Sequence, residues 1–205
     1  MKHNNKKIKS IVREKYSRVA ISSESGCSKE CCSGLLNPAE IASYGETLGY
    51  EKDRIAMELN KANLGLGCGN PLAIADLKEG EVVLDLGSGA GFDVFLAAKS
   101  VGGKGYVIGV DMTSEMVAIA RKNAEELKVS NCEFRLGEIE NLPVDDDFVD
   151  VVVSNCVINL SPDKRAVYRE ILRVLRPGGR ISISDVLRSG EIPREIKDDP
   201  SAYTG

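Results

Sequence analysis

Six cysteines and a single histidine limit the chemistry that this sequence of 205 residues can perform. The histidine, His3, lies close to the amino terminus, where chain ends are commonly frayed. A mechanism that needs a histidine base or a histidine metal ligand is therefore nearly excluded. Cysteine thiolates act as nucleophiles and as ligands for soft ions. Sulfur is thus the richer source of any reactive group.

Two of the cysteines lie where a bound ligand could approach them. Cys68 occurs in the stretch Gly-Leu-Gly-Cys-Gly-Asn-Pro, and so much glycine allows the backbone to come close to a bound group. Cys156 ends the segment Ser154-Asn155-Cys156, which follows an apolar run that is predicted to be a buried strand of a parallel sheet. Because ligands bind beyond the carboxyl ends of such strands, we expect Cys156 beside a ligand; burial as a small apolar side chain is the alternative.

The other cysteines give weaker signals. Cys27, Cys31 and Cys32 cluster in a serine-rich loop, with a C-x3-C-C spacing that fits the common zinc sites poorly. Cys132 begins a predicted strand at the end away from the ligand side, and we expect it to pack in the core.

A glycine-rich turn with an acidic partner is the second chemical signal. Residues 83–91 read Val-Leu-Asp-Leu-Gly-Ser-Gly-Ala-Gly, between a predicted strand and a predicted helix. Such a turn lets a ligand lie against bare backbone at a helix amino terminus. Asp111, twenty residues beyond Gly91, ends the next strand and is placed to accept hydrogen bonds from a ribose diol. The G-x-G-x-G spacing is one residue shorter than the dinucleotide pattern, which argues against a nicotinamide cofactor; a turn that binds nothing is the remaining alternative.

The elements that must position these residues follow from the apolar pattern, in which strands and helices alternate from residue 80 onward. We expect strands at 81–86, 105–110, 132–136, 150–154 and 180–186, and helices at 92–100, 113–128 and 161–175, the last closed by Pro177-Gly178-Gly179. Continuous apolar runs joined by helices indicate a parallel sheet that is buried on both faces. The predicted fold class is α/β, a doubly wound and mostly parallel sheet.

A helical extension is expected in front of the sheet. The pattern predicts helices at 5–20, 38–48 and near 52–60, a loop at 22–36 and a turn of helix at 71–77. The predicted domains are therefore an N-terminal helical extension with a cysteine loop, 1–77, and a sheet domain, 78–205.

Bulk properties narrow the possible partners. The formal net charge of −4 argues against nucleic acid as the main partner, and the basic residues among the first eighteen are expected to form a solvated helix face. The sequence contains no apolar run long enough to cross a membrane and no apolar core of a secretory signal. We therefore expect a cytoplasmic protein with no membrane partner, whose thiols stay reduced rather than forming a disulfide framework.

Three segments together resemble the class I S-adenosylmethionine-dependent methyltransferases: Asp85-Leu86-Gly87-Ser88-Gly89-Ala90-Gly91, Gly109-Val110-Asp111-Met112 and Leu175-Arg176-Pro177-Gly178-Gly179. The resemblance covers residues 80–187 and implies a Rossmann-like methyltransferase sheet with S-adenosylmethionine as cofactor. It places the three glycines of the turn under the methionine part, Asp111 on the ribose hydroxyls, and Met112 with Glu138-Ile139 beside the adenine. The expected cofactor-binding residues are Asp85, Gly87, Ser88, Gly89, Gly91, Asp111, Met112, Glu138, Ile139 and Asn155.

The cysteine segments sharpen this resemblance. Gly67-Cys68-Gly69-Asn70-Pro71 and Ser154-Asn155-Cys156-Val157-Ile158-Asn159-Leu160 are similar to the signatures of arsenite methyltransferases, which hold trivalent arsenic with cysteine thiolates. The resemblance implies that Cys68 and Cys156 bind arsenic as catalytic ligands, with Cys32 as the third and Cys31 as its alternative. Soft thiolates suit arsenic(III), whose remaining lone pair can take up a methyl group without a general base. The protein's main task is then to position donor and acceptor.

The predicted activity is methylation of arsenite, or of its thiol conjugate, with thioredoxin or glutathione as a thiol reductant. One alternative is a methyltransferase for another small acceptor, such as a quinone or a thiol; another is a non-catalytic arsenic-binding or sensing protein. The polar segment after Val186 is not expected to supply the two further strands that usually complete a class I sheet. Residues 1–205 are accordingly expected to bind the cofactor but to methylate poorly.

Overall fold

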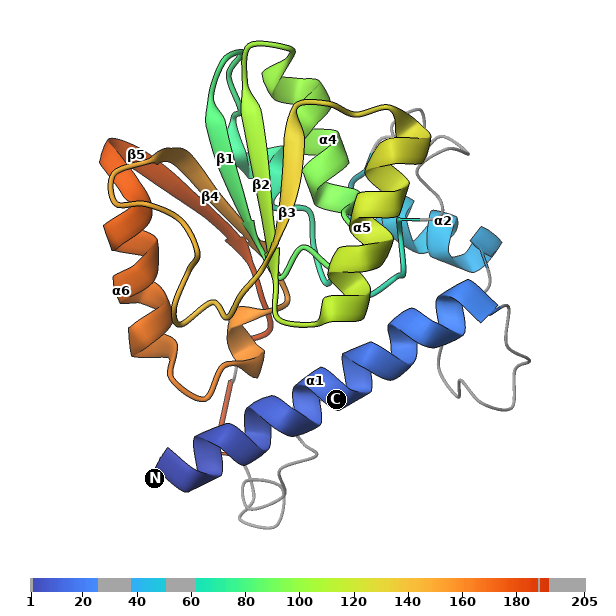
Figure 1. Cartoon of the computed structure of the whole chain (residues 1–205), viewed down its shortest axis with the longest axis vertical. Helices are drawn as coiled ribbons and strands as arrows, with labels where there is room; N and C mark the ends of the chain where they lie inside the picture. Colours follow the sequence, from blue (N-terminus) through green and yellow to red (C-terminus); the bar gives the residue numbers. More distant parts are fainter. Residues whose placement is uncertain (1, 26–37, 51–61, 188, 192–205) are drawn as a thin grey trace.

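A sheet of five parallel strands forms the centre of the computed structural model, which describes residues 2–25, 38–50, 62–187 and 189–191 (Figure 1). In chain order the strands are β1 (Val82–Leu86), β2 (Tyr106–Asp111), β3 (Cys132–Leu136), β4 (Val149–Asn155) and β5 (Leu175–Ser184). Their spatial order is β3-β2-β1-β4-β5. The predicted α/β class and the parallel sheet are confirmed.

Helices cover both faces of the sheet. Figure 1 shows α4 (Phe92–Val101) and α5 (Ser114–Leu127) on one face and α6 (Lys164–Val174) on the other. The long helix α1 (Lys2–Ser25) runs past the ends of the strands and packs against α5. The short elements are α2 (Pro38–Thr47), α3 (Leu72–Ala75) and the 3-10 turn η2 (Ile158–Leu160).

The apolar strands divide their side chains between two cores. Successive residues of a strand point to opposite faces, so Val83 packs in the core beneath α4 and α5, whereas Leu84 packs in the core beneath α6. Both side chains are fully buried. Burial of both faces explains why β1, β2 and β4 read as nearly continuous apolar runs.

The helix that was predicted to begin at Ser161 begins three residues later, at Lys164. Asp163 occupies the N-cap position, and its carboxylate accepts a hydrogen bond from the backbone nitrogen of Ala166 at 3.0 Å. The Ser161 hydroxyl donates instead to Glu140, at 2.6 Å.

The last strand also begins earlier than predicted, at Leu175 rather than at residue 180. Val149 pairs with Leu175, whereas Val151 pairs with Arg180, so the Pro-Gly-Gly segment forms a bulge between these two pairs. The same residue types can end a helix or interrupt a strand, which is why the sequence pattern placed this boundary wrongly.

The extension before the sheet differs from its prediction in length. α1 is longer at both ends than the predicted helix 5–20 and takes up the start of the predicted loop 22–36. α2 matches the helix predicted at 38–48, and α3 is shorter than the predicted turn 71–77. The predicted helix near 52–60 and the loop cysteines Cys27, Cys31 and Cys32 lie outside the described residues, and the division into 1–77 and 78–205 stays a prediction.

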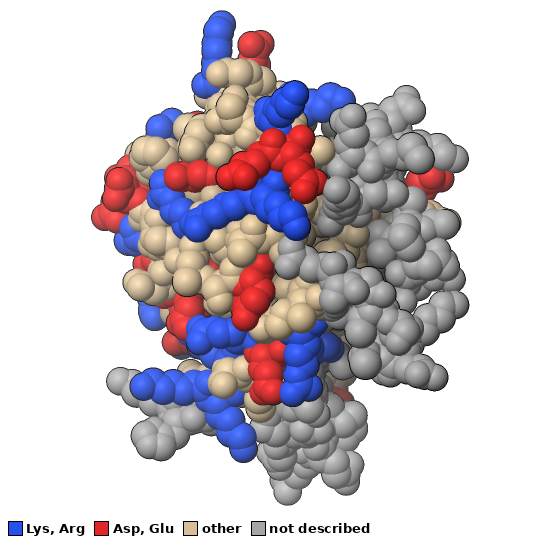
Figure 2. All heavy atoms as spheres, turned by 45° about the vertical axis from the view of Figure 1, so that its right-hand side comes forward, with Lys and Arg blue, Asp and Glu red and all other residues tan. Residues whose placement is uncertain are grey.

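The described surface carries both signs of charge. On the face in Figure 2, acidic and basic side chains are interleaved rather than gathered by sign. Within the described ranges, no helix combines the length and the apolar character that a membrane span requires.

Gly109 tests the packing that holds the glycine turn against the sheet. A Cβ atom at this position in β2 would lie 2.7 Å from Cδ1 of Phe134 and 2.8 Å from Oγ of Ser88. We expect Gly109→Ala to lower the free energy of unfolding by about 1–3 kcal/mol, as measured by urea denaturation. The matched control is Gly103→Ala, where a Cβ would meet nothing within 4 Å. An equal effect of both substitutions would contradict this account.

Candidate active site

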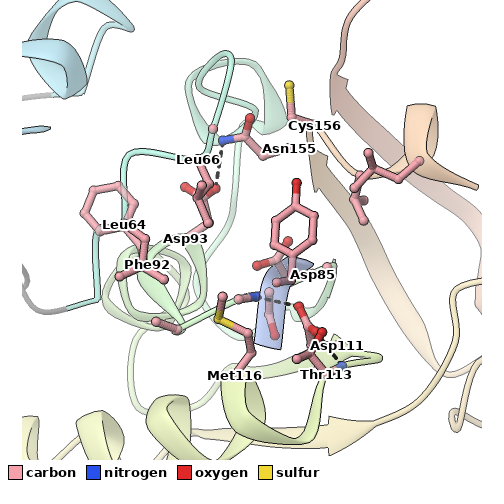
Figure 3. A pocket seen from close by; sticks show the side chains of 18 of the residues that line it. Leu64, Leu66, Asp85, Phe92, Asp93, Asp111, Thr113, Met116, Asn155 and Cys156 are labelled. Atoms are coloured by element: carbon pink, nitrogen blue, oxygen red, sulfur yellow. Dashed lines mark hydrogen bonds between the residues drawn. The ribbon is translucent and has the colours of Figure 1, made fainter. Parts of the chain in front are cut away.

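A pocket lies at the carboxyl ends of β1, β2 and β4 (Figure 3). Its walls come from the glycine turn after β1, the segments that follow β2 and β4, one side of α1, and the loop that begins at Ala62. Of the predicted site residues, those that line it are Asp85, Gly87, Ser88, Gly89, Asp111, Met112, Ile139, Asn155 and Cys156. The structure thus brings most of the predicted set to one pocket.

The glycine turn has the backbone conformation that its sequence requires, with positive φ at Gly87, Gly89 and Gly91. A Cβ at Gly89 would meet nothing within 4 Å, so the chain there is open on the pocket side. At Gly91 a Cβ would lie 2.8 Å from the rings of Phe95 and Phe134. Gly91 therefore packs against the core beneath α4 and is not among the residues that line the pocket.

Asp111 holds the glycine turn to the end of β2. Its carboxylate accepts hydrogen bonds from the backbone nitrogens of Gly89, at 3.0 Å, and Thr113, at 2.8 Å. Burial raises the pKa of Asp111, and these hydrogen bonds oppose that rise. Thr113 occupies the N-cap position of α5, but its side chain makes no capping bond and instead hydrogen-bonds Asp111.

Two further carboxylates face the same pocket (Figure 3). Burial raises the pKa of Asp85 well above its usual range, and the neighbouring charges of Asp93 and Asp111 raise it further. The pKa of Asp93 is also raised by burial. Lys9 is the only basic side chain among the described lining residues. A pocket with this excess of buried acidic groups fits a ligand that carries positive charge.

The Ser88 hydroxyl offers one more group to a ligand. Ser88 is buried and lines the pocket, and its Oγ has no hydrogen-bond partner within the part of the chain that the structure describes. Buried hydroxyls are normally hydrogen-bonded, so this atom is suited to a ligand contact.

Glu138 does not line the pocket with its neighbour Ile139. Its carboxylate binds the α1 side chains Lys9, at 2.8 Å, and Arg13, at 3.0 Å. Lys9 also reaches Glu140, at 3.0 Å. As a cofactor-binding residue, Glu138 stays a prediction.

Helix α1 is therefore docked over the site. The sequence pattern predicted only a solvated basic face for this segment. Beyond these ion pairs, Ser17 donates to Glu115 of α5 at 2.8 Å. Val12 and Tyr16 line the pocket directly. Some basic residues of this segment, Lys9 and Arg13, form ion pairs that bind the helix to the sheet domain. The sequence pattern alone did not reveal these contacts.

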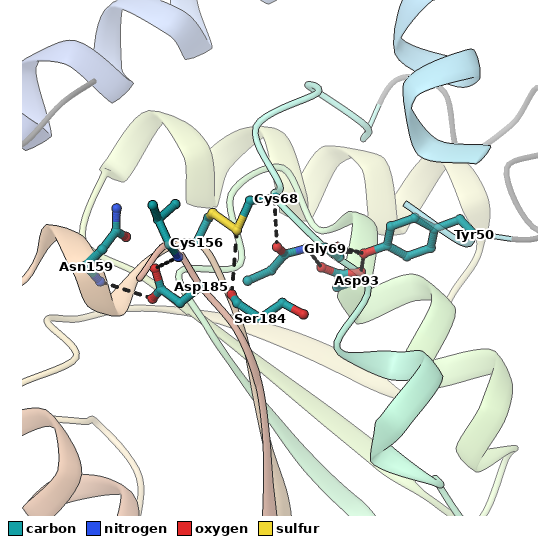
Figure 4. The surroundings of a disulfide bond; sticks show 10 residues. Tyr50, Cys68, Gly69, Asp93, Cys156, Asn159, Ser184 and Asp185 are labelled. Atoms are coloured by element: carbon teal, nitrogen blue, oxygen red, sulfur yellow. Dashed lines mark hydrogen bonds between the residues drawn. A yellow bond between two sulfur atoms is a disulfide. The ribbon is translucent and has the colours of Figure 1, made fainter. Parts of the chain in front are cut away.

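Cys68 and Cys156 are joined by a disulfide, with their Cα atoms 5.8 Å apart (Figure 4). The expectation that no disulfide would form is wrong for this pair. Cys156 lines the pocket (Figure 3), whereas Cys68 is not among the lining residues. Residues 88 positions apart thus meet where β4 ends.

Cys156 has a backbone conformation that is rare for its type, with φ of +54°. A left-handed conformation costs a residue with a side chain about 1 kcal/mol. Its backbone nitrogen donates to the carbonyl oxygen of Ser184 at 2.9 Å, so β5 supports this turn. The Cys156 sulfur at this turn is bonded to the sulfur of Cys68.

The other predicted sulfur ligand, Cys32, lies outside the described residues. Within the described ranges, no cluster of three or more His, Cys, Asp or Glu residues has the arrangement of a metal site. Cys132 begins β3 as a free, half-buried thiol that packs against the core, as predicted. Burial raises the pKa of Cys132 to about 11, which leaves it protonated at neutral pH.

Sequence reasoning missed a buried polar group beside the cysteines. The Tyr50 hydroxyl donates to Oδ1 of Asp93 at 2.7 Å, and the Asn155 amide donates to Oδ2 of the same carboxylate at 3.1 Å. The one signal for Asp93 in the sequence was its acidic side chain within the otherwise apolar start of α4. No local pattern marks Tyr50, which lies 105 residues from Asn155.

Comparison with known proteins agrees with this geometry. The family model described as "Methyltransferase domain" matches residues 77–205. The chain belongs to this family. The class I S-adenosylmethionine-dependent type that the sequence resembles is confirmed.

Among known methyltransferases, the chain is 50% identical to the arsenite methyltransferase of Halobacterium salinarum, over 95% of this chain and 51% of that protein. It is similar to the crystal structure of an arsenic(III) S-adenosylmethionine methyltransferase from Chlamydomonas reinhardtii, with 40% identity, a TM-score of 0.64, and coverage of 78% of this chain and 54% of that one. A 2-phytyl-1,4-naphthoquinone methyltransferase of Synechococcus elongatus is 38% identical, over 54% of this chain and 48% of that protein. The chain spans about half the length of these relatives.

The ion pairs of Lys9 can be tested through the docking of α1. We expect Lys9→Met, which keeps the apolar stem but removes the charge, to weaken docking by about 1 kcal/mol and to speed amide hydrogen exchange in α1 roughly fivefold. Arg18→Met is the matched control, because its pair with Glu14 lies within the same helix and is exposed. Equal acceleration by the two substitutions would contradict a role for the Lys9 contacts.

The buried carboxylates predict an unusual dependence of stability on pH. Their raised pKa values mean that the folded protein binds more protons than the unfolded chain, so the free energy of unfolding rises as pH falls from neutral through those values. We expect Asp85→Asn to stabilise the ligand-free protein at neutral pH and to flatten this dependence. Urea denaturation from neutral to mildly acidic pH measures both effects, with exposed Asp145→Asn as control. A profile for Asp85→Asn that parallels the unchanged protein would refute the assignment.

Proposed function

We propose that this methyltransferase domain takes part in the methylation of trivalent arsenic, with S-adenosylmethionine as methyl donor. The observation that carries the proposal is the meeting of the Cys68 and Cys156 sulfurs at the edge of a pocket built around the glycine turn. It is supported by the similarity to arsenite methyltransferases, whose names state that acceptor.

The pocket residues suit S-adenosylmethionine by charge and by shape. When bound, this cofactor supplies a methyl group on a positively charged sulfur. The Asp85 and Asp93 carboxylates favour that charge, and the Asp111 carboxylate lines the pocket at the end of β2, where ribose hydroxyls can donate to it. The open backbone at Gly89 and the free Ser88 hydroxyl complete the cradle. Met112 and Ile139 supply apolar contacts for an adenine ring.

The thiolates of Cys68 and Cys156 hold the arsenic substrate in this proposal, with Cys32 as third ligand. Arsenic(III) is soft and thiophilic, so sulfur is preferred over the carboxylates nearby. Its lone pair would form the bond to the methyl carbon while the carbon–sulfur bond of the donor breaks and its electron pair stays on sulfur as a neutral thioether, so no proton has to be removed from the acceptor. The side chains therefore act by positioning and by excluding other nucleophiles. The strained backbone of Cys156 fits such a role, because strain of this kind is commonly kept at functional sites.

The disulfide has to be reduced before either sulfur can bind arsenic. Two thiols of a reductant such as glutathione, or the dithiol of thioredoxin, convert Cys68–Cys156 to two cysteines and leave as a disulfide. A cytoplasmic location, where such reductants are abundant, is part of the proposal.

Substitution of the paired cysteines tests the proposal. We expect Cys68→Ser and Cys156→Ser each to abolish arsenite binding and arsenic methylation, because a serine hydroxyl is a poor ligand for a soft ion. The dissociation constant for S-adenosylmethionine should stay within about twofold of the unchanged protein, since neither sulfur forms the cofactor cradle. Titration calorimetry gives both affinities, and separation of methylated arsenic species after one turnover gives the activity.

Cys132→Ser is the matched control for these variants, because Cys132 is a half-buried thiol distant from the pocket. It should show the same arsenite affinity and the same level of methylation as the unchanged protein. Full arsenite binding by both Cys68→Ser and Cys156→Ser would disprove the proposed acceptor. Methyl transfer to a quinone that survives those substitutions, without any to arsenic, would point to the other acceptor class.

A further inference from the structure

The Asn155 side chain clamps the loop that carries Cys68. Its Oδ1 accepts a hydrogen bond from the backbone nitrogen of Cys68 at 3.1 Å, and its Nδ2 donates to the carbonyl oxygen of Gly69 at 2.9 Å. One amide therefore grips two neighbouring backbone groups of the loop. Because Asn155 directly precedes Cys156, the clamp fixes one cysteine of the pair relative to the other (Figure 4).

Glycine on either side of Cys68 allows this close contact. A Cβ at Gly67 would lie 2.7 Å from Nδ2 of Asn155, and one at Gly69 would lie 2.6 Å from Oγ of Ser184. Both approaches are shorter than a side chain permits without movement of its neighbour. The glycines that were interpreted as room for a ligand thus lie against the ends of β4 and β5.

Asp93 and Tyr50 fix the orientation of the clamp. Oδ2 of Asp93 accepts from Nδ2 of Asn155 at 3.1 Å, which holds the amide with its nitrogen toward Gly69 and its oxygen toward Cys68. The Tyr50 hydroxyl donates to the other oxygen of Asp93 at 2.7 Å and lies 3.2 Å from the Gly69 carbonyl oxygen. Tyr50 is buried, and its ring packs edge-on against Phe92 with centroids 5.1 Å apart.

We propose that Tyr50 and Asp93 are positioning residues for the Cys68–Cys156 pair, acting through the amide of Asn155. Neither side chain has to touch arsenic or cofactor in this role. A buried carboxylate that is shared by two donors has one stable arrangement, so the amide cannot turn over without breaking a hydrogen bond. Loss of that arrangement lets the loop move away from the end of β4. The two sulfurs then spend less time within reach of each other.

The effective concentration of the two thiols measures this positioning directly. In a glutathione buffer, one glutathione disulfide oxidises the Cys68 and Cys156 thiols to their disulfide and leaves as two glutathione molecules. The equilibrium constant of this exchange reports how well the fold places one sulfur near the other. After acid quenching and alkylation, digestion with trypsin separates Cys68 in peptide 62–78 from Cys156 in peptide 136–164, and from each other cysteine of the full chain.

We expect Tyr50→Phe to lower that equilibrium constant by about three- to tenfold, which corresponds to the loss of one buried hydrogen bond. The apolar contact of its ring with Phe92 is kept. Asp93→Asn should lower the constant at least as much, because an amide cannot accept from Tyr50 and Asn155 at once through two oxygens. Tyr106→Phe, the same chemical change at the start of β2, should leave it within about twofold.

Two outcomes overturn the inference. One is an unchanged equilibrium constant in both Tyr50→Phe and Asp93→Asn. The other is a Tyr50→Phe protein with lower affinity for S-adenosylmethionine and an unchanged constant, which would make Tyr50 a cofactor-binding residue instead. The measurement uses no arsenic, so its result does not depend on the proposed function. Only the conclusion that this positioning serves arsenite binding rests on the proposed function.

Discussion

In the sheet, β1 pairs on one side with β2 and on the other with β4, and the direction in which the chain adds strands reverses between these two pairs. The connections that follow β1 and β4 must therefore diverge, which leaves space at their carboxyl ends. The glycine turn occupies one side of that space, and Asn155 with Cys156 occupies the other. Each further feature of the site, from the Asp111 contacts to the docking of α1, is built around this opening.

The opening is acidic at a cost to the ligand-free fold. Asp85 and Asp93 are buried within one pocket, and their raised pKa values show that the folded state disfavours their charged forms. Such an arrangement is understandable where a cationic ligand offsets the repulsion. The Lys9 ammonium does not serve this purpose, because Glu138 and Glu140 bind it at the edge of the site. The buried carboxylates thus lower the stability of the ligand-free fold and make the pocket complementary to a cationic ligand.

The sequence allowed the strands, the glycine turn, and the places of Asp111 and Cys156 to be predicted, because each depends on residues that are close together in the chain. Apolar runs mark buried strands, and whatever follows such a strand lies at the ligand side of the sheet. Contacts that join distant segments had no such signal. Lys9 meets Glu138 across 129 positions, and Tyr50 meets Asn155 across 105. The bulge at Pro177-Gly178-Gly179 was missed for a different reason, since its local pattern also ends helices.

The pairing of Cys68 with Cys156 shows how these two kinds of information combine. The chain itself places Cys156 directly after β4, in a left-handed turn whose backbone nitrogen donates to the carbonyl oxygen of Ser184 in β5. Cys68 has no comparable support from its own loop, in which glycines flank it on both sides. Its position comes from Asn155, which grips the backbone at Cys68 and Gly69, and from the acidic group that keeps Asn155 in one orientation. A soft ion bound between the two sulfurs would therefore have two ligands that are positioned in different ways. Cys156 is positioned by its own strand and turn, whereas Cys68 is positioned by a buried hydrogen-bond network that includes Asn155.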